Sequence, residues 1–219
     1  MGLTSTEENY LKAIFKIQER KGQAATNEIA AELQTSAASV SDMIKKLSQK
    51  DLLHYEKYKG SQLSDQGRRF ATTLIRKHRL WESFLVEKLN FNWDEIHVIA
   101  EELEHIKSPK LIRQLDAFLG FPKYDPHGDP IPTEQGHFHQ RKQIQLSKMK
   151  PSELGVIVGV KEHSTTFLQF LDQQGLVLGA RVQFKKQFDF DESVEVVIDD
   201  ADKKTLSKKV SENIYVQLN

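Results

Sequence analysis

The spacing of apolar residues changes once along this 219-residue chain, and that change limits the folds open to it. Up to residue 119 the apolar residues recur every three to four positions, which is typical of amphipathic helices. A proline-rich stretch at 120–149 interrupts regular structure, and short alternating runs after Pro151 predict strands. We therefore predict a mainly α fold with small β parts, in which most strands form a small C-terminal β domain.

Composition excludes several classes of protein. The chain has no cysteine, so disulfides and thiolate metal sites are excluded, and any bound metal must take imidazole or oxygen ligands. No apolar run approaches the roughly 20 residues that a membrane span needs, and the first ten residues lack the order of a signal peptide. We expect a soluble, cytoplasmic protein with no membrane partner.

The net charge of zero hides an uneven distribution of charged residues. Residues 1–80 hold 14 Lys and Arg against 9 Asp and Glu, whereas residues 81–145 hold 7 against 11. The basic front of the chain suits a polyanion, and the acidic middle suits cations. The excess at the front is modest, and an ordinary solvated surface could also carry it.

The first 64 residues have the pattern of a winged helix-turn-helix. Helices are predicted over 6–20, 27–33 and 37–53, with Thr26 and Ser36 as caps of the second and third, and a pair of short strands follows as the wing. A short solvated helix in any α domain would give part of this pattern, but the adjoining hairpin favours DNA binding. The residues that we expect to face DNA are Thr26, Ser36, Ala37, Ala38, Ser39, Ser41, Lys45, Lys46, Lys57 and Lys59.

Three further helices are predicted over residues 65–89, 94–106 and 108–119, the last with Pro109 in its first turn. Their load of large apolar residues exceeds what three helices need for their own packing. Burial against a second copy of the chain is the economical explanation. A two-fold homodimer of this kind would also match palindromic double-stranded DNA.

Residues of metal-binding type recur at helical spacings between residues 78 and 105. Because residues three or four apart share a helix face, they form one pair and one continuous stripe of four. Packed carboxylates repel one another unless a cation is present, and imidazole with carboxylate suits ions such as Mn²⁺ or Fe²⁺. A single His/Glu pair more often belongs to a solvated helix face, but six such residues in phase favour a metal site. The pair is His78 and Glu82, and the stripe is His97, Glu101, Glu104 and His105.

The chain closely resembles the diphtheria-toxin-repressor family of metal-dependent transcription regulators in five segments: TNEIAAELQTSAASVSDMIKKLSQKDLL, YEKYKGSQLSDQGR, HRLWESFLVEKL, HVIAEELEHI and FPKYDPHGDPIP. It resembles in particular the manganese-transport regulators that carry a C-terminal FeoA-type domain. The resemblance implies a winged helix-turn-helix domain at 1–64, a helical metal-binding and dimerisation domain with a proline-rich loop at 65–149, and an SH3-like β-barrel at 150–219. The implied function is a Mn²⁺-activated repressor of metal-uptake genes, with an Fe²⁺-activated repressor as the alternative.

The resemblance also implies two sets of metal ligands. The activating site would consist of Asn9, Glu101, Glu104 and His105. The companion site would consist of His78, Glu82 and His97, and it would recruit Asp125, His127 and Glu162.

Three positions depart from the family pattern. Asn9 stands where relatives commonly have Asp or Met, and Lys12 stands where some manganese sensors have Glu. Asp125 stands where similar relatives often have Cys, which favours harder metals. Lys12 cannot bind a metal while it is protonated, so a closely spaced pair of metal ions is not expected beside it.

Two other functions stay open. Helices bearing His and Glu can also build a di-metal hydrolase or oxygenase, although the chain lacks the paired Glu-x-x-His motifs of such bundles. A winged-helix regulator could instead respond to a small organic molecule, which would leave the six residues of metal-binding type unexplained.

Overall fold

The computed structural model describes residues 2–56 and 60–219. The chain divides into two compact units, and helix α4 (Asp65–Leu89) contributes to both. No helix in the described ranges is long and apolar enough to cross a membrane. The first unit contains Met1–His78, Glu102–Ser108 and Pro132–Phe138, and the second contains Arg79–Glu101, Pro109–Ile131 and His139–Asn219.

Three helices open the first unit, and local signals determine where they begin. α1 (Ser5–Lys21) starts at a capping box in which Thr4 and Glu7 each accept the other's backbone N–H. α2 (Thr26–Glu32) and α3 (Ala37–Ser48) follow it. The three predicted helices are therefore confirmed, although α3 ends five residues earlier than expected.

The two predicted caps have different outcomes. The Ser36 hydroxyl accepts the Ser39 N–H and caps α3, which confirms that prediction. The predicted Thr26 cap is wrong, because Thr26 is already the first residue of α2. Ala25 occupies the N-cap position, and the Glu28 carboxylate accepts its backbone N–H.

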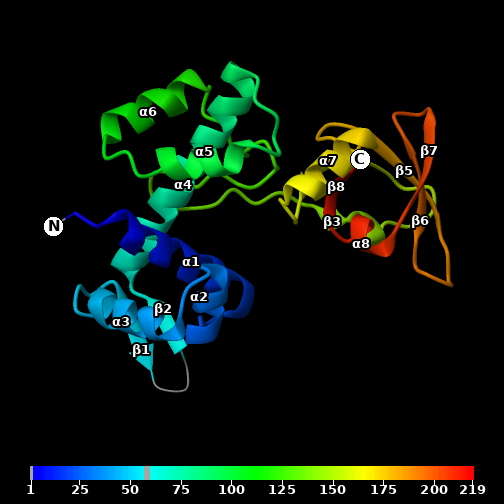
Figure 1. Cartoon of the computed structure of the whole chain (residues 1–219). Coiled ribbons are helices and arrows are strands. Elements are labelled where there is room, and N and C mark those ends of the chain that lie inside the picture. The colour runs from blue at the N-terminus through cyan, green and yellow to red at the C-terminus, as the bar shows by residue number, and fades with distance from the viewer. Residues whose placement is uncertain (1, 57–59) are drawn as a thin grey trace. The chain divides into compact units, whose positions relative to one another are not determined.

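The predicted wing is an antiparallel hairpin of β1 (Leu53–Glu56) and β2 (Gly60–Leu63) that lies beside α3 (Figure 1). Gly60 has φ +89° and lies against the Ala24 carbonyl, which a Cβ would approach to 2.8 Å. Only glycine accepts both constraints without strain. The predicted DNA contacts Lys57 and Lys59 lie outside the described residues.

Among the described residues of the first unit, one apolar core joins its helices and hairpin. The opposite face of α3 is exposed to solvent. Residues from α1, α2, α3, β1 and the first part of α4 contribute to the core. Its fully buried members include Leu11, Ile14, Ile29, Val40, Leu47, Leu52 and Leu53.

The middle helices are α4, α5 (Ile96–Leu103) and α6 (Pro109–Phe118). The bounds of α4 match the prediction, but α5 is shorter than the predicted 94–106. Glu104 and His105 lie in the turn that follows α5, so the predicted continuous stripe is wrong. The reason is tertiary, because both side chains contact residues of α1 instead of continuing the α5 face.

The C-terminal strands form one antiparallel sheet in the order β3-β8-β4-β5-β6-β7. Short helical segments connect them, and apolar side chains of both fill the core below the sheet. The fold class is confirmed as mainly α with small β parts. The strands are β3 (Ile144–Gln145), β4 (Leu154–Val160), β5 (Arg181–Gln187), β6 (Val194–Ile198), β7 (Asp202–Leu206) and β8 (Ile214–Leu218), and the helices are η1 (Leu146–Lys148), α7 (Thr165–Gln173) and α8 (Lys208–Ser211).

A buried carboxylate joins α1 to the end of α3. Glu7 is fully buried, and its Oε1 lies 2.6 Å from Lys50 Nζ and 3.0 Å from Lys46 Nζ. Burial alone would raise the pKa of Glu7, but hydrogen bonds from Lys50, the Thr4 N–H and Lys46 lower it to about 2.

Glu7→Gln should destabilise the protein by about 2 kcal/mol at pH 7, because it removes hydrogen bonds to a charged acceptor. The pKa of Glu7 is lower in the folded state, so this contribution is complete above pH 4.5 and disappears as the pH falls toward 2. Urea unfolding followed by circular dichroism between pH 2 and 7 measures it. Glu32→Gln, which removes an exposed ion pair with Arg20, should change stability by less than about 1 kcal/mol. Equal stability of Glu7→Gln and wild type at pH 7 would contradict this role.

Candidate metal centre

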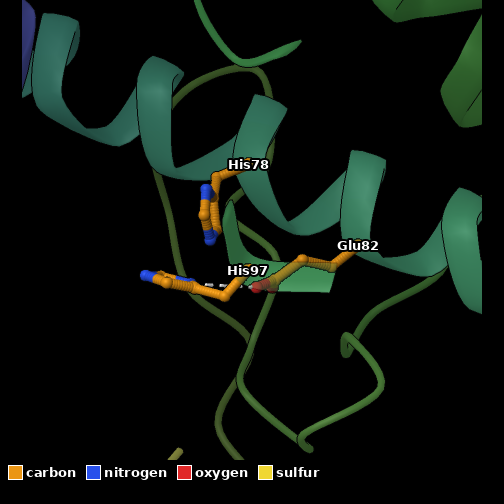
Figure 2. A group of neighbouring side chains, drawn as sticks. All are labelled: His78, Glu82 and His97. Carbon is orange, nitrogen blue, oxygen red and sulfur yellow. Dashed lines mark hydrogen bonds and ion pairs between the residues drawn. The ribbon is translucent and has the colours of Figure 1, made fainter. Parts of the chain in front are cut away.

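Three residues of metal-binding type converge at α4 and α5. His78 and Glu82 are buried one turn apart on α4, and His97 comes from the start of α5. Figure 2 shows the two imidazole rings and the carboxylate directed toward one another. Each residue offers one ligand atom, and the three atoms lie within 4.8 Å of one another. His97 Nδ1 is 3.4 Å from Glu82 Oε1.

A second group shares Glu82 with the first. Glu82, Asp125 and His127 are all buried, and their ligand atoms also lie within 4.8 Å of one another. His127 Nδ1 lies 3.9 Å from Glu82 Oε2. Glu82 thus directs one oxygen toward His97 and the other toward His127.

The hydrogen bonding of His127 fixes which of its nitrogens can bind a cation. Its Nε2 lies 2.8 Å from the Trp93 carbonyl oxygen, which can only accept, so Nε2 carries the proton. The other nitrogen, Nδ1, is buried and has no hydrogen-bond partner among the described residues. A buried lone pair that faces a carboxylate needs a cation or water between them. By this test the residues around Glu82 fit a divalent metal ion.

The loop that carries His127 is held by strand β4. The His127 carbonyl accepts the Val160 N–H at 3.0 Å, and a Cβ on Gly128 would lie only 2.1 Å from the Val158 carbonyl oxygen. Gly128 also has φ +86°, so no other residue suits this turn. The C-terminal β domain therefore determines where His127 lies.

Asp125 carries an electrostatic penalty in the absence of a cation. Burial raises its pKa well above the ordinary value, and the nearby carboxylates of Asp129 and Glu82 raise it further. Arg79 opposes this effect from 3.4 Å. A metal ion beside Glu82 would add further positive charge to this group of acids.

Glu162, the predicted ligand from the C-terminal domain, has another partner. Its carboxylate accepts the Ser164 hydroxyl at 2.7 Å, and it belongs to neither group. The neighbouring His163 is the residue that reaches the centre, with its ring stacked on His127 at 4.5 Å. Burial lowers the pKa of His163, which favours the neutral ring. The sequence favoured Glu162 over His163, since no spacing in the sequence links His163 to residue 127.

The predicted activating set has Glu104 at its centre, and this carboxylate is already paired. Glu104 is fully buried, with Oε1 2.6 Å from Lys12 Nζ and Oε2 2.6 Å from His78 Nδ1. Burial alone would raise its pKa, but the hydrogen bond from His78 and the charge of Lys12 lower it. Glu104 is therefore an ionised partner of two other side chains.

The other members of that set have further partners. His105 Nδ1 lies 2.6 Å from Glu8, and its Nε2 lies 3.8 Å from Glu104 Oε1. His97 Nε2 lies 3.7 Å from the half-exposed Glu101. Asn9 Oδ1 is buried without a hydrogen-bond partner in the described part of the chain. Among the described residues, the two groups of His, Asp and Glu side chains that could hold a metal ion include none of Glu101, Glu104 and His105. The set therefore stays a prediction, with Lys12 already paired to Glu104 in this arrangement. Sequence reasoning missed Glu8, one position before Asn9, as the partner of His105.

The outer face of α3 is the second candidate surface. Its first turn is exposed, and the Lys45 side chain is 74% exposed beside Asp42. The predicted residues Ser41 and Lys46 also have internal partners, since the Ser41 hydroxyl donates to the Ala37 carbonyl and Lys46 pairs with Glu7. The exposed residues of the predicted set are Ser36, Ala37, Ala38, Ser39, Lys45 and Lys46, and Thr26 and Ser41 are half-buried.

Family models match three successive parts of the chain. They are the N-terminal DNA-binding domain of iron-dependent repressors at residues 2–61, the metal-binding and dimerisation domain of the same repressors at 64–133, and the FeoA domain at 144–218.

Known proteins are similar over the same regions. The iron-dependent repressor IdeR of Mycobacterium tuberculosis is 33% identical over 130 residues, which span 59% of this chain but only 56% of IdeR. The HTH-type transcriptional regulator MntR of Oceanobacillus iheyensis is 33% identical over 122 residues, 56% of this chain and 82% of that protein. A solved manganese-dependent transcriptional repressor in complex with manganese superposes with a TM-score of 0.87 at 32% identity, covering 97% of this chain and all of the other. The chain belongs to the diphtheria-toxin-repressor family, the iron-dependent repressors and their manganese-dependent relatives.

Proposed function

We propose that this protein is a metal-activated, DNA-binding transcriptional repressor, with Mn²⁺ as the activating ion and Fe²⁺ as the alternative. The observation that carries the proposal is the buried cluster around Glu82, in which His127 Nδ1 has no hydrogen-bond partner among the described residues. A solved relative named a manganese-dependent repressor supports Mn²⁺, and IdeR, named iron-dependent, keeps Fe²⁺ as the alternative. The proposal assigns no enzymatic reaction to the site.

The ligands that we propose are His78, Glu82, His97, Asp125 and His127. A bound dication would supply the positive charge that their carboxylates need. Their partners orient the rings, because the Trp93 carbonyl holds the proton of His127 on Nε2 and Glu104 accepts from His78 Nδ1. A set of imidazole and carboxylate ligands without thiolate suits Mn²⁺ and Fe²⁺ alike. Glu162 and the set of Asn9, Glu101, Glu104 and His105 remain predictions from the family resemblance.

The DNA-binding role that we propose rests on the exposed start of α3. Small residues there allow close approach to the major groove, and Lys45 and Lys46 add attraction to phosphates. In this proposal residues 1–64 bind DNA, 65–149 bind metal and dimerise, and 150–219 form the FeoA-type domain.

The homodimer that we propose would use the exposed apolar side chains of the middle helices. Val98 is 68% exposed, Phe118 64% and Phe121 67%. Apolar side chains this exposed favour burial against another protein surface. A two-fold pairing through them would present two copies of α3 to a palindromic operator.

The central test is fluorescence anisotropy of a palindromic DNA selected by this protein from a random-sequence pool. Chelator-treated protein is titrated at fixed salt, alone, with Mn²⁺ or with anaerobic Fe²⁺. We expect tight binding only with metal, and the two ions are ranked by the affinity each produces. Metal activation would be rejected if the protein bound the selected DNA with the same affinity in the presence of chelator as in the presence of metal.

His127→Ala and Glu82→Gln should each weaken Mn²⁺ binding by about 100-fold or more, since removal of an outer-shell partner alone typically costs about 10- to 100-fold. Isothermal titration calorimetry of the full chain measures this affinity, and circular dichroism checks the fold. The control is Glu102→Gln, an exposed acid on α5 outside both groups, which should bind Mn²⁺ as wild type does. Wild-type affinity in His127→Ala would remove His127 from the site.

Lys45→Ala should weaken DNA binding and reduce the slope of log K against log salt by about 1.8 for the proposed dimer, because about 0.9 is lost for each of its two phosphate contacts. Mn²⁺ affinity should stay unchanged. Anisotropy titrations at several salt concentrations give the slope, and Lys185→Ala, an exposed lysine on β5, serves as the matched control. An unchanged slope in Lys45→Ala would show that this side chain does not contact phosphate.

A further inference from the structure

A buried ion pair joins helix α1 to the segment that follows α5. Lys12 Nζ lies 2.6 Å from Glu104 Oε1, and the two side chains are 7% and 0% exposed. The partners are 92 positions apart in the sequence and belong to the same compact unit. Burial of either charge alone would be strongly unfavourable, so each stabilises the ionised form of the other.

The second oxygen of Glu104 is also engaged. Glu104 Oε2 lies 2.6 Å from His78 Nδ1, and the carboxylate therefore accepts from a proton on that nitrogen. This hydrogen bond makes Nε2 the nitrogen of His78 that a metal ion would take. The two contacts form a chain from Lys12 through Glu104 to His78, which belongs to the group with Glu82 and His97.

Positive side chains already balance the acids in this region. Lys12 pairs with Glu104, and Lys77 lies close enough to Glu8 and Glu104 to interact with both carboxylates. Asn9, on the same face of α1 as Lys12, is neutral and adds no negative charge. A dication at Glu104 would displace or face the Lys12 ammonium, and like charges at this distance repel.

We propose that the Lys12 ammonium acts as a built-in cation at Glu104 and takes the place of a second metal ion there. Glu104 is then a positioning residue that orients His78 and is not itself a metal ligand. The inference rests on the proposed function, because it assumes that a metal ion binds around Glu82. Its consequence is that α1 is tied to His78 through Glu104 by a covalently attached charge, which no chelator removes.

The test counts Mn²⁺ ions bound per chain by equilibrium dialysis and elemental analysis of the full-length protein. Glu104→Gln should bind the same number of ions as wild type, with affinity lowered about 10- to 100-fold, as expected for an outer-shell partner. Lys12→Glu should bind one ion more than wild type, because two facing carboxylates replace the ion pair. Lys16→Glu, an exposed position one turn along α1, should leave the count unchanged.

Two results would overturn the proposal: loss of one Mn²⁺ per chain in Glu104→Gln, or an unchanged count in a folded Lys12→Glu. If Lys12→Glu does not fold, Lys12→Gln replaces it, and a count above the wild-type value at saturating Mn²⁺ again supports the inference, whereas an equal count opposes it. A wild-type protein that binds no Mn²⁺ or Fe²⁺ would reject the proposed function itself, so the two failures are distinguishable.

Discussion

A carboxylate removed from water needs a compensating charge or several hydrogen bonds, and this requirement shapes the helical part of the protein. Glu7 meets it with two lysines of α3 and the turn after it, and Glu104 meets it with Lys12 and His78. Both solutions join segments that are far apart in the sequence. Glu82 and Asp125 have imidazoles and other acids beside them, and Arg79 lies 3.4 Å from Asp125. In the proposed function a metal ion would add further positive charge beside these two acids.

His78 and His127 are each held in place by contacts within their own compact unit. His78 is oriented through Glu104 by a lysine of α1, and His127 is oriented by backbone contacts with Trp93 and β4. In the proposed function, a metal ion would stabilise the arrangement of the segments that carry its ligands. Such linkage between metal binding and conformation can change the affinity for DNA.

The sequence was most informative where structure is local. Helical periodicity predicted α4 to the residue, and local residue signals predicted the Ser36 cap and the hairpin of the wing. The pair His78 and Glu82 lies on one helix face, as its spacing indicated. It was least informative at the ends of helices and across loops. The predicted helix through Ile106 ends at Leu103, since pattern alone cannot show that Glu104 and His105 find partners on α1.

The sequence by itself determined the class of fold, the donor chemistry of the site and the family, because apolar period, residue type and motif are local properties of the chain. Only the tertiary structure decided which donors meet. It placed Glu82 beside His127 of the proline-rich loop, and it stacked His163, not Glu162, on the His127 ring. It also paired Glu104 with Lys12. The physical reason is that the energy of a buried charge depends on neighbours a few ångströms away, and those neighbours are set by packing between distant segments.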